Sequence, residues 1–379
     1  MSWRRWLKRA GLAVLALALL GFAVLFATSD ALKSFGGTPD PAQMKKSPRW
    51  SDGSFHNLEP TRMLTVSGTK MASAWLFGGD KLREPNCPLP MDHADLARFA
   101  TPPESGLRLT WLGHSTVLIE IDGKRLLTDP QWSERTSPST ALGPKRFHPP
   151  PVPLERLPKL DAVLVSHDHY DHLDMSTVRA LAKTGVVFHV GLGVGAHLKV
   201  WGVPDAQVVE HEWWQEADLG GLKLVSTPAR HFSGRGFGRD LTSWTSWSLV
   251  GPTHRVFFSG DSGMTPSFSA IADKLGPFDV AMLEIGQWHP TWGDIHLGPR
   301  GALDAFALLG AKKLLPIHWA TFELGLHSWS EPAETLYVEG QKRGVPLLTP
   351  LLAQSVELET PTTPWWRALP PTASGCPPP

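Results

Sequence analysis

The sequence predicts an α/β domain in which sheets and helices form layers. Two observations favour this fold class. Closely spaced apolar runs near the start of the predicted domain indicate strand hairpins, and later apolar or β-branched runs alternate with helical segments. Alternation of this kind is typical of layered α/β domains. A chain of 379 residues is long enough for one such domain with additions at either end.

Short runs rich in apolar and β-branched residues predict the strands. The earliest runs are close enough in sequence to form a hairpin, and the later ones alternate with helices. The predicted strands are Leu107–Trp111, Val117–Ile121, Ala162–Ser166, Val186–Val190, Leu222–Ser226, Val256–Ser259, Val280–Ile285 and Leu314–Ile317.

The segments between the later strands predict helices. They are Met175–Ala182, Pro266–Leu275, Pro299–Leu309 and Glu331–Arg343. The helix at Pro299 has a proline in its first turn and Gly310 just after its last residue, which is the favoured asymmetry of helix ends.

The overall charge disfavours a nucleic-acid partner. Lys and Arg together number 36, as do Asp and Glu, so the net charge is zero and no global basic field would attract a phosphate backbone. The chain has 17 tryptophans but only two tyrosines. So many amphipathic rings suit a protein that works near a membrane or binds an apolar ligand.

The N-terminus carries a basic cluster followed by an apolar run. Arg4, Arg5, Lys8 and Arg9 precede the uninterrupted apolar residues Gly11–Ala27. This is the layout of a secretory signal or an uncleaved anchor, and we favour the anchor because the run is long for a signal core. The basic residues would keep the N-terminus in the cytoplasm and place the rest of the chain outside it, on the periplasmic side in a bacterium. Secretion after signal cleavage is the alternative.

The anchor or signal, residues 1–30, is followed by less regular segments at both ends of the predicted domain. Residues 31–105 are rich in Pro, Gly and polar residues and predict a linker with some elaboration. Residues 351–379 predict a loose, proline-rich tail. Cys87 and Cys376 lie in these two segments, and sequence alone leaves open whether they form a disulfide or remain two incidental thiols.

The run Ser166–His172 predicts a metal site. It follows the predicted strand Ala162–Ser166, so its side chains would lie on a loop at the edge of a sheet. His167 and His169 are two residues apart in extended backbone and would point to the same side, where they could share one ion. Asp171 and His172 could serve a second ion. Imidazoles and carboxylates without a thiolate are ligands for zinc or a similar divalent metal.

The spacing His-x-His-x-Asp-His after a strand resembles the signature of the metallo-β-lactamase fold. The resemblance implies a four-layer αββα sandwich over residues 106–350. It also implies three further ligands, each at or just after the end of an apolar run: His231, Asp261 and His318.

Other segments are similar to the family of phospholipases D that hydrolyse N-acylphosphatidylethanolamines, with their bacterial relatives. These segments are Thr110–Thr116, Leu127–Pro130, Gly143–Phe147, Gly276–Asp279 and His318–Phe322. The sequence departs from the family pattern at Arg230 and in the loop Gly286–Trp292, which leaves the substrate open.

The resemblance assigns roles to the ligands of two zinc ions, with Mn or Fe as other options. One ion is expected on His167, His169 and His231, the second on Asp171, His172 and His318, and Asp261 would bridge them. Asp171 is also the expected proton acceptor. Asp129 would orient a ligand histidine, although an Asp-Pro pair is also a turn signal.

The expected substrate contacts are His114, which would line the pocket, Tyr170 and Trp288, which would wall an apolar cleft for acyl chains, and His296. For His296 a plain loop residue is the alternative. The favoured function is a zinc-dependent phosphodiesterase that cleaves a phospholipid, held at the membrane by its N-terminal segment. A lactonase or other ester hydrolase uses the same chemistry and is the first alternative. A non-catalytic, membrane-anchored scaffold is the second. The sequence indicates no oligomeric state.

Overall fold

The computed structural model describes residues 3, 9, 11–17, 21, 30–67, 69–70, 73–74, 78–80, 82–92, 96–236, 238–370 and 376. Two sheets face each other within this part of the chain. The first has the strand order β15-β3-β4-β5-β6-β7-β8, made of Ser355–Val356, Leu107–Trp111, Val117–Ile121, Lys124–Thr128, Ala162–Leu164, Val187–Gly191 and Val208–His211. The second has the order β14-β13-β12-β11-β10-β9, made of Lys313–Ile317, Val280–Glu284, Arg255–Phe258, Ser246–Val250, Lys223–Thr227 and Glu216–Asp218.

Each sheet begins with antiparallel pairs and ends with parallel ones. In the first sheet β3, β4 and β5 pair antiparallel, whereas β5 through β8 are parallel. In the second sheet β9 through β12 are antiparallel, whereas β12, β13 and β14 are parallel. This arrangement points the carboxyl ends of β10, β12, β13 and β14 toward one edge, where the polar residues that follow them can meet.

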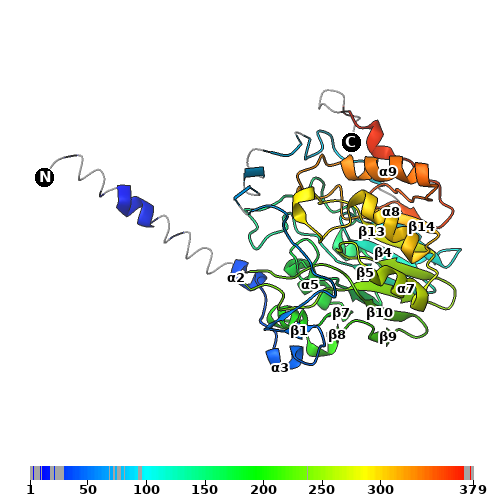
Figure 1. Ribbon diagram of the computed structural model, residues 1–379, viewed down its shortest axis with the longest axis horizontal. Helices are drawn as coiled ribbons and strands as arrows, with labels where there is room; N and C mark the ends of the chain where they lie inside the picture. Colours follow the sequence, from blue (N-terminus) through cyan, green and yellow to red (C-terminus); the bar gives the residue numbers. More distant parts are fainter. Residues whose placement is uncertain are drawn as a thin grey trace.

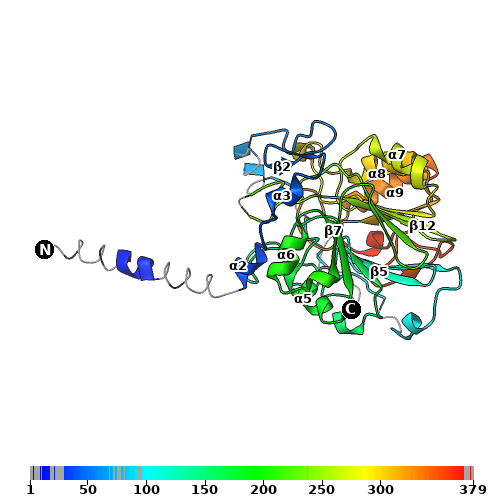
Figure 2. The same cartoon turned by 90° about the horizontal axis from the view of Figure 1, so that it is seen from below.

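Helices cover the outer face of each sheet, so the architecture is the predicted four-layer sandwich. Helices α5 (Met175–Ala182) and α6 (Gly195–Val200) pack on the first sheet through a core that includes Leu118, Val163 and Val178. Helices α7, α8 and α9 lie on the opposite side of the domain, against the second sheet (Figures 1 and 2). Their bounds are Ser267–Leu275, Gly298–Leu309 and Glu331–Arg343.

The largest core lies between the two sheets. Trp111 and Ile119 of the first sheet belong to the same buried cluster as Leu224, Trp247 and Phe258 of the second. Burial of this apolar surface is the main force that holds the layers together. Gly310 ends α8 in the left-handed conformation, with φ 60°, as its position after the helix predicts.

Every predicted strand and helix is present, and no end differs from its predicted position by more than two residues. The sequence analysis missed β5, β8, β9, β11, β15 and α6. The missed strands lack a continuous apolar run, because β5 opens on Lys124 and Arg125 and β11 carries buried serines at Ser246 and Ser248. Whether such segments form strands depends more on pairing with neighbouring strands and on burial than on the β-propensity of their residues.

The C-terminal segment is packed, so the prediction of a loose tail is wrong for its described part. Strand β15 pairs with β3, and the short helix η5 (Trp365–Ala368) buries Trp365 and Trp366. Both rings lie 5.4 Å from the ring of Trp319. A disulfide joins Cys376 to Cys87. Burial of the large aromatic side chains in the core orders this segment despite its many prolines.

The segment before the domain is also more than a linker. Helices α2 (Ala31–Ser34) and α3 (Pro41–Met44) and the hairpin β1–β2 (Trp50–Ser51, Ser54–Phe55) lie against the domain. Arg49 is buried and bonds Glu212 at 2.9 Å, while its guanidinium lies over the ring of Trp213. Little of this was visible in the sequence, because a buried arginine among prolines and glycines has no periodic signal.

The predicted anchor lies largely outside the described residues. Residues 11–17 and 21 of the apolar run are helical, and among the described residues we find no helix with the length and apolar character needed to cross a bilayer. The anchor therefore stays a prediction.

Candidate metal centre

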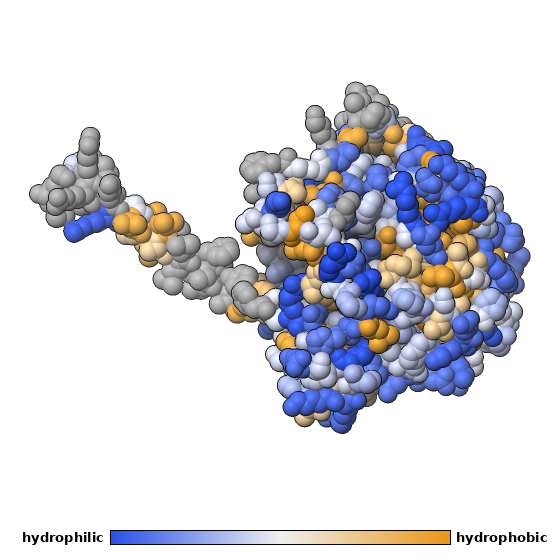
Figure 3. Space-filling model, viewed as in Figure 1, coloured by the Kyte–Doolittle hydropathy of each residue, from blue (hydrophilic) through white to orange (hydrophobic). Residues whose placement is uncertain are grey.

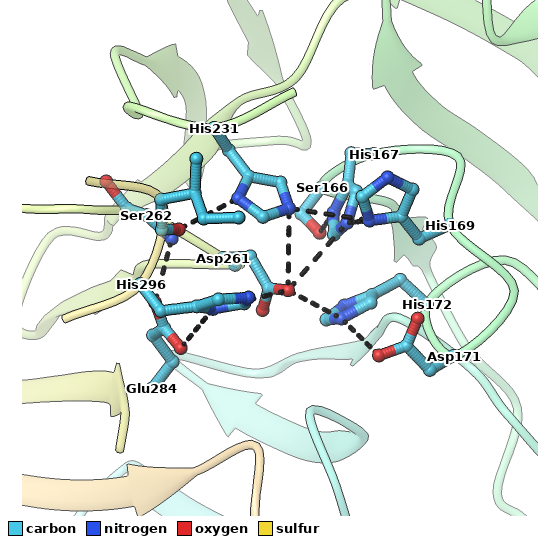
Figure 4. Close-up of polar contacts among 12 residues, drawn as sticks. Ser166, His167, His169, Asp171, His172, His231, Asp261, Ser262, Glu284 and His296 are labelled. Atoms are coloured by element: carbon cyan, nitrogen blue, oxygen red, sulfur yellow. Dashed lines mark hydrogen bonds and ion pairs between the residues drawn. The ribbon is translucent and has the colours of Figure 1, made fainter. Parts of the chain in front are cut away.

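Four strand ends bring the predicted ligands to one edge of the sandwich. The run Ser166–His172 follows β6, His231 follows β10, Asp261 follows β12, and His318 follows β14. Figure 4 shows the imidazoles of His167, His172 and His231 turned toward the carboxylate of Asp261. The strands are buried on both faces, so the side chains at their ends are held by rigid backbone.

His167, His169, His231 and Asp261 form the first cluster. Nδ1 of His169 lies 2.8 Å from Nε2 of His167 and 3.4 Å from Nε2 of His231. Oδ2 of Asp261 lies 3.9 Å and 3.7 Å from those two Nε2 atoms. One donor atom from each of the four residues fits within 4.8 Å, which is close enough for a single cation.

Asp171, His172 and His318 form the second cluster, together with His114. Oδ2 of Asp171 lies 3.2 Å from Nε2 of His172, 3.3 Å from Nε2 of His318 and 2.9 Å from Nε2 of His114. His114, which we expected to contact substrate, is thus a fourth donor of this cluster. Asp261 also reaches this cluster, because its two oxygens lie 3.2 Å from Nε2 of His172 and of His318.

Hydrogen bonds on the far side of the rings aim the donor atoms inward. Asp129 accepts from His172 Nδ1 at 2.7 Å and from the Ser166 backbone and hydroxyl at 2.7 and 2.6 Å. His231 Nδ1 donates to the carbonyl of Ile295 at 2.9 Å. When Nδ1 carries the proton, the lone pair of Nε2 faces the cluster, which is the orientation a metal ligand needs.

The chemistry of the donor set fits divalent metal ions. Within the described part of the chain, His172 Nε2 and Asp261 Oδ1 are buried and have no hydrogen-bond partner. Buried polar atoms are costly without one, and a cation between them would satisfy both. Nitrogen and oxygen donors without a thiolate suit zinc, and also manganese or iron.

Comparison with known proteins identifies the family. Residues 124–319 match a family model described as the beta-lactamase superfamily domain, which is more than half of the chain. The chain belongs to the metallo-β-lactamase superfamily. The structure agrees with this membership in its two facing sheets and covering helices.

Several relatives of this metallo-β-lactamase superfamily member are similar to it over most of its length. An uncharacterized protein of Mycobacterium tuberculosis is 44% identical over 364 residues, which is 92% of this chain and 97% of the relative. The N-acyl-phosphatidylethanolamine-hydrolyzing phospholipase D 1 of Caenorhabditis elegans is 36% identical over 247 residues, 62% of this chain and 69% of the relative. A solved metallo hydrolase from Ignicoccus hospitalis shares the fold, with a TM-score of 0.51 and 24% identity over 66% of this chain and 97% of its own.

The two clusters of this metallo-β-lactamase site differ in charge. Burial lowers the pKa of His167 and His231 well below the ordinary value, so the first cluster holds neutral imidazoles. Burial also disfavours a charged His318, but Asp261 and Asp171 outweigh it and raise its pKa to about 10. Asp261 and Asp171 likewise raise the pKa of His172 well above its ordinary value, against the effect of burial. In the absence of a cation, the second cluster therefore holds protons where the first does not.

Two important residues escaped the sequence analysis. Glu284, the last residue of β13, is completely buried and accepts hydrogen bonds from His296 Nδ1 and the Leu297 backbone, both at 2.9 Å. Asn57 bonds both the carbonyl and the amide of His231, at 2.7 and 3.1 Å. A carboxylate that ends an apolar strand was a visible signal for Glu284. Nothing in the sequence distinguishes Asn57.

The other residues expected to contact substrate lie at different distances from the clusters. His296 Nδ1 lies 4.0 Å from Oδ2 of Asp261, so it borders the clusters. The Tyr170 hydroxyl donates to the carbonyl of Arg235 at 2.7 Å and is therefore already engaged. Trp288 is half-buried beside Gly298 at the start of α8. Arg230 turns away from the clusters, donating to Thr61 and to the carbonyls of Pro60 and Met264, and so fastens the N-terminal segment beside the site.

Replacing Asp129 with Asn tests the orienting role of its carboxylate. The amide can no longer hold the Nδ1 proton of His172 as a charged acceptor, so we expect metal affinity to fall by about 10–100-fold. Asp122→Asn is the matched control, because Asp122 makes the same contact, 2.7 Å, with Nδ1 of His254 far from the clusters. Metal content after dialysis against a competing chelator measures the difference. Equal retention in both variants would contradict the role.

The charge difference predicts that the two ions load with different pH dependence. A ligand must lose its proton to bind a metal, so the raised pKa values of His172 and His318 weaken binding to the second cluster as the pH falls. The first cluster has no such proton to lose near neutrality. Calorimetric zinc titration between pH 6 and pH 8, in buffers of different ionisation enthalpy, should show one step that releases protons and one that does not. Two steps with the same buffer dependence would contradict the assignment.

Proposed function

We propose that this metal-dependent hydrolase cleaves the phosphodiester of a phospholipid on the side of the head-group alcohol, with N-acylphosphatidylethanolamine as the substrate class. The products are then a phosphatidic acid and an N-acylethanolamine. Zinc is the proposed metal of both clusters.

The observation that carries the proposal is the position of Asp261, within reach of both clusters at once. A shared carboxylate holds two cations close together, which is the arrangement of two-metal phosphodiesterases. When bound, two divalent ions lower the pKa of water from about 15.7 toward 7 and neutralise charge on the phosphoryl oxygens.

The chain itself supplies the groups that hold protons around that centre. Asp171 is partly accessible, with 13% of its side chain exposed, and His114 contacts its Oδ2. The pKa of Asp171 is held well below the ordinary value by neighbouring histidines despite its burial, so the group is ionised. The ionised carboxylate is the form that a general base requires. His296, held by Glu284, stands on the other side of Asp261 and is available to the leaving alcohol.

The named relative supports the choice of substrate. The phospholipase D of C. elegans is described by its hydrolysis of N-acyl-phosphatidylethanolamine, and it matches 62% of this chain. Several of the segments that resemble that family lie beside the clusters. Thr321 accepts the backbone N–H of His114 at 2.7 Å, and Asp129 holds His172.

The proposed location is the outer face of a membrane. The disulfide between Cys87 and Cys376 supports a compartment outside the reducing cytosol, where disulfides persist. The basic cluster and apolar run at the N-terminus would supply the attachment.

The test is hydrolysis of a defined N-acylphosphatidylethanolamine in ¹⁸O-labelled water. Attack at phosphorus places the label in phosphatidic acid, which mass spectrometry detects, and leaves the N-acylethanolamine unlabelled. Asp261→Asn should reduce turnover by at least about 10³-fold, the scale of losing a major electrostatic contact in catalysis. Asp304→Asn, which removes an exposed carboxylate from α8, should keep normal turnover.

Other outcomes identify the other functions. Label in a carboxylate, with phosphodiesters left intact, would indicate an ester hydrolase or lactonase. A protein that binds no metal and turns over neither class would be a scaffold.

A further inference from the structure

The chain enters the folded domain through a firmly docked segment. The carbonyls of Lys33 and Ser34 accept hydrogen bonds from Trp201 Nε1 at 2.6 Å and from Arg235 Nε at 2.8 Å. Asp30, the residue before α2, pairs with Arg179 of α5 at 2.9 Å. These contacts fasten residues 30–34 to the body of the domain.

The docked segment begins immediately after the predicted membrane segment. The apolar run ends at Ala27 and Asp30 is already held by Arg179. Three residues span at most about 10 Å when fully extended. If the run Gly11–Ala27 crosses a bilayer, the face of the domain around α2 must therefore lie close to the lipid surface.

This face has the chemistry that a lipid surface accepts. Leu32 on α2 and Val200 at the end of α6 are about half exposed, at 49% and 50%. They belong to neighbouring segments, because Gly37 packs directly against Val200. Figures 1 and 2 place α2 at the left-hand edge of the domain, beside α6 in Figure 2, and Figure 3 shows both apolar and hydrophilic residues at this edge. A mainly apolar hollow of about 350 Å³, lined by residues including Pro39, Pro41, Trp50 and Leu241, lies beside α3.

A buried arginine connects this face to the metal centre. Arg235 is 5% exposed and bonds Ser34 on one side and the carbonyls of Asp168 and Leu173 on the other, at 2.7 and 2.8 Å. Its guanidinium lies 3.9 Å from the ring centre of Tyr170. Asp168 and Tyr170 belong to the ligand run, so one side chain separates the entering segment from that run.

We propose that the face formed by α2 and the C-terminal end of α6 rests on the lipid bilayer, and that this contact sets the orientation of the metal centre relative to the membrane. Leu32 and Val200 enter the interfacial layer, and Arg235 transmits the position of the docked segment to the ligand run. This bilayer contact rests on the proposed lipid hydrolysis, because it would bring the metal centre to the surface where a phospholipid substrate lies.

The experiment uses the full chain reconstituted into vesicles of phosphatidylcholine and phosphatidylglycerol. Leu32→Cys and Val200→Cys are labelled with an environment-sensitive fluorophore, and lipids that carry a spin label in the acyl chain serve as quenchers. The native cysteines are joined in the disulfide and do not compete for label. Val338→Cys on α9 is the matched control, because Val338 is also exposed, at 36%, but lies on the opposite side of the sandwich.

We expect quenching at positions 32 and 200 to exceed that at position 338 by at least about twofold, since side chains in the interface lie within about 5–10 Å of the acyl boundary. Equal, water-like emission at all three positions would overturn the proposal. A count of one free thiol in each variant before labelling shows that the disulfide has formed. The readout needs no turnover, so a failure of the proposed lipid hydrolysis would leave this result interpretable.

Discussion

The shared carboxylate of Asp261 is the interaction on which the rest of the structure depends. It is buried among imidazoles that come from four different parts of the chain, and its oxygens lie 3.2 Å from Nε2 of His172 and of His318. Such a group is stable only when paired with positive charge. Protons on the second cluster can provide that charge, and divalent cations can provide it better. The fold brings four strand ends together, and the negative charge that they enclose is best neutralised by bound divalent cations.

Local backbone strain accompanies this arrangement. His114, Asp129 and His318 all have left-handed backbone, with φ values of 49°, 34° and 67°. Non-glycine residues avoid this region, so such strain persists only where surrounding contacts enforce it. The contacts are visible: the backbone N–H of His318 donates to the carbonyl of His114 at 2.9 Å, and Trp111 Nε1 donates to the same carbonyl. The two strained histidines therefore hold each other in place.

The sequence predicted the run Ser166–His172 well, because its donors are adjacent along the chain and their density has no ordinary structural explanation. His231, Asp261 and His318 were predictable only from the resemblance to a family, since a single histidine or aspartate after a strand is common. Asn57 could not be predicted because its role arises from a contact across the fold, whereas Glu284 had a visible signal as a carboxylate that ends an apolar strand. The tail was misjudged for a related reason: its prolines dominate the local pattern, while the burial of Trp365 and Trp366 depends on partners more than 30 residues away, such as Trp319.

The central claim is that Asp261 joins two metal ions in one centre. Anomalous diffraction from a crystal of the zinc-loaded protein, recorded on both sides of the zinc absorption edge, tests it directly. The account predicts two peaks, one among His167, His169 and His231 and one among Asp171, His172 and His318, with the carboxylate of Asp261 between them. A single peak, or two peaks of which neither touches Asp261, would contradict it.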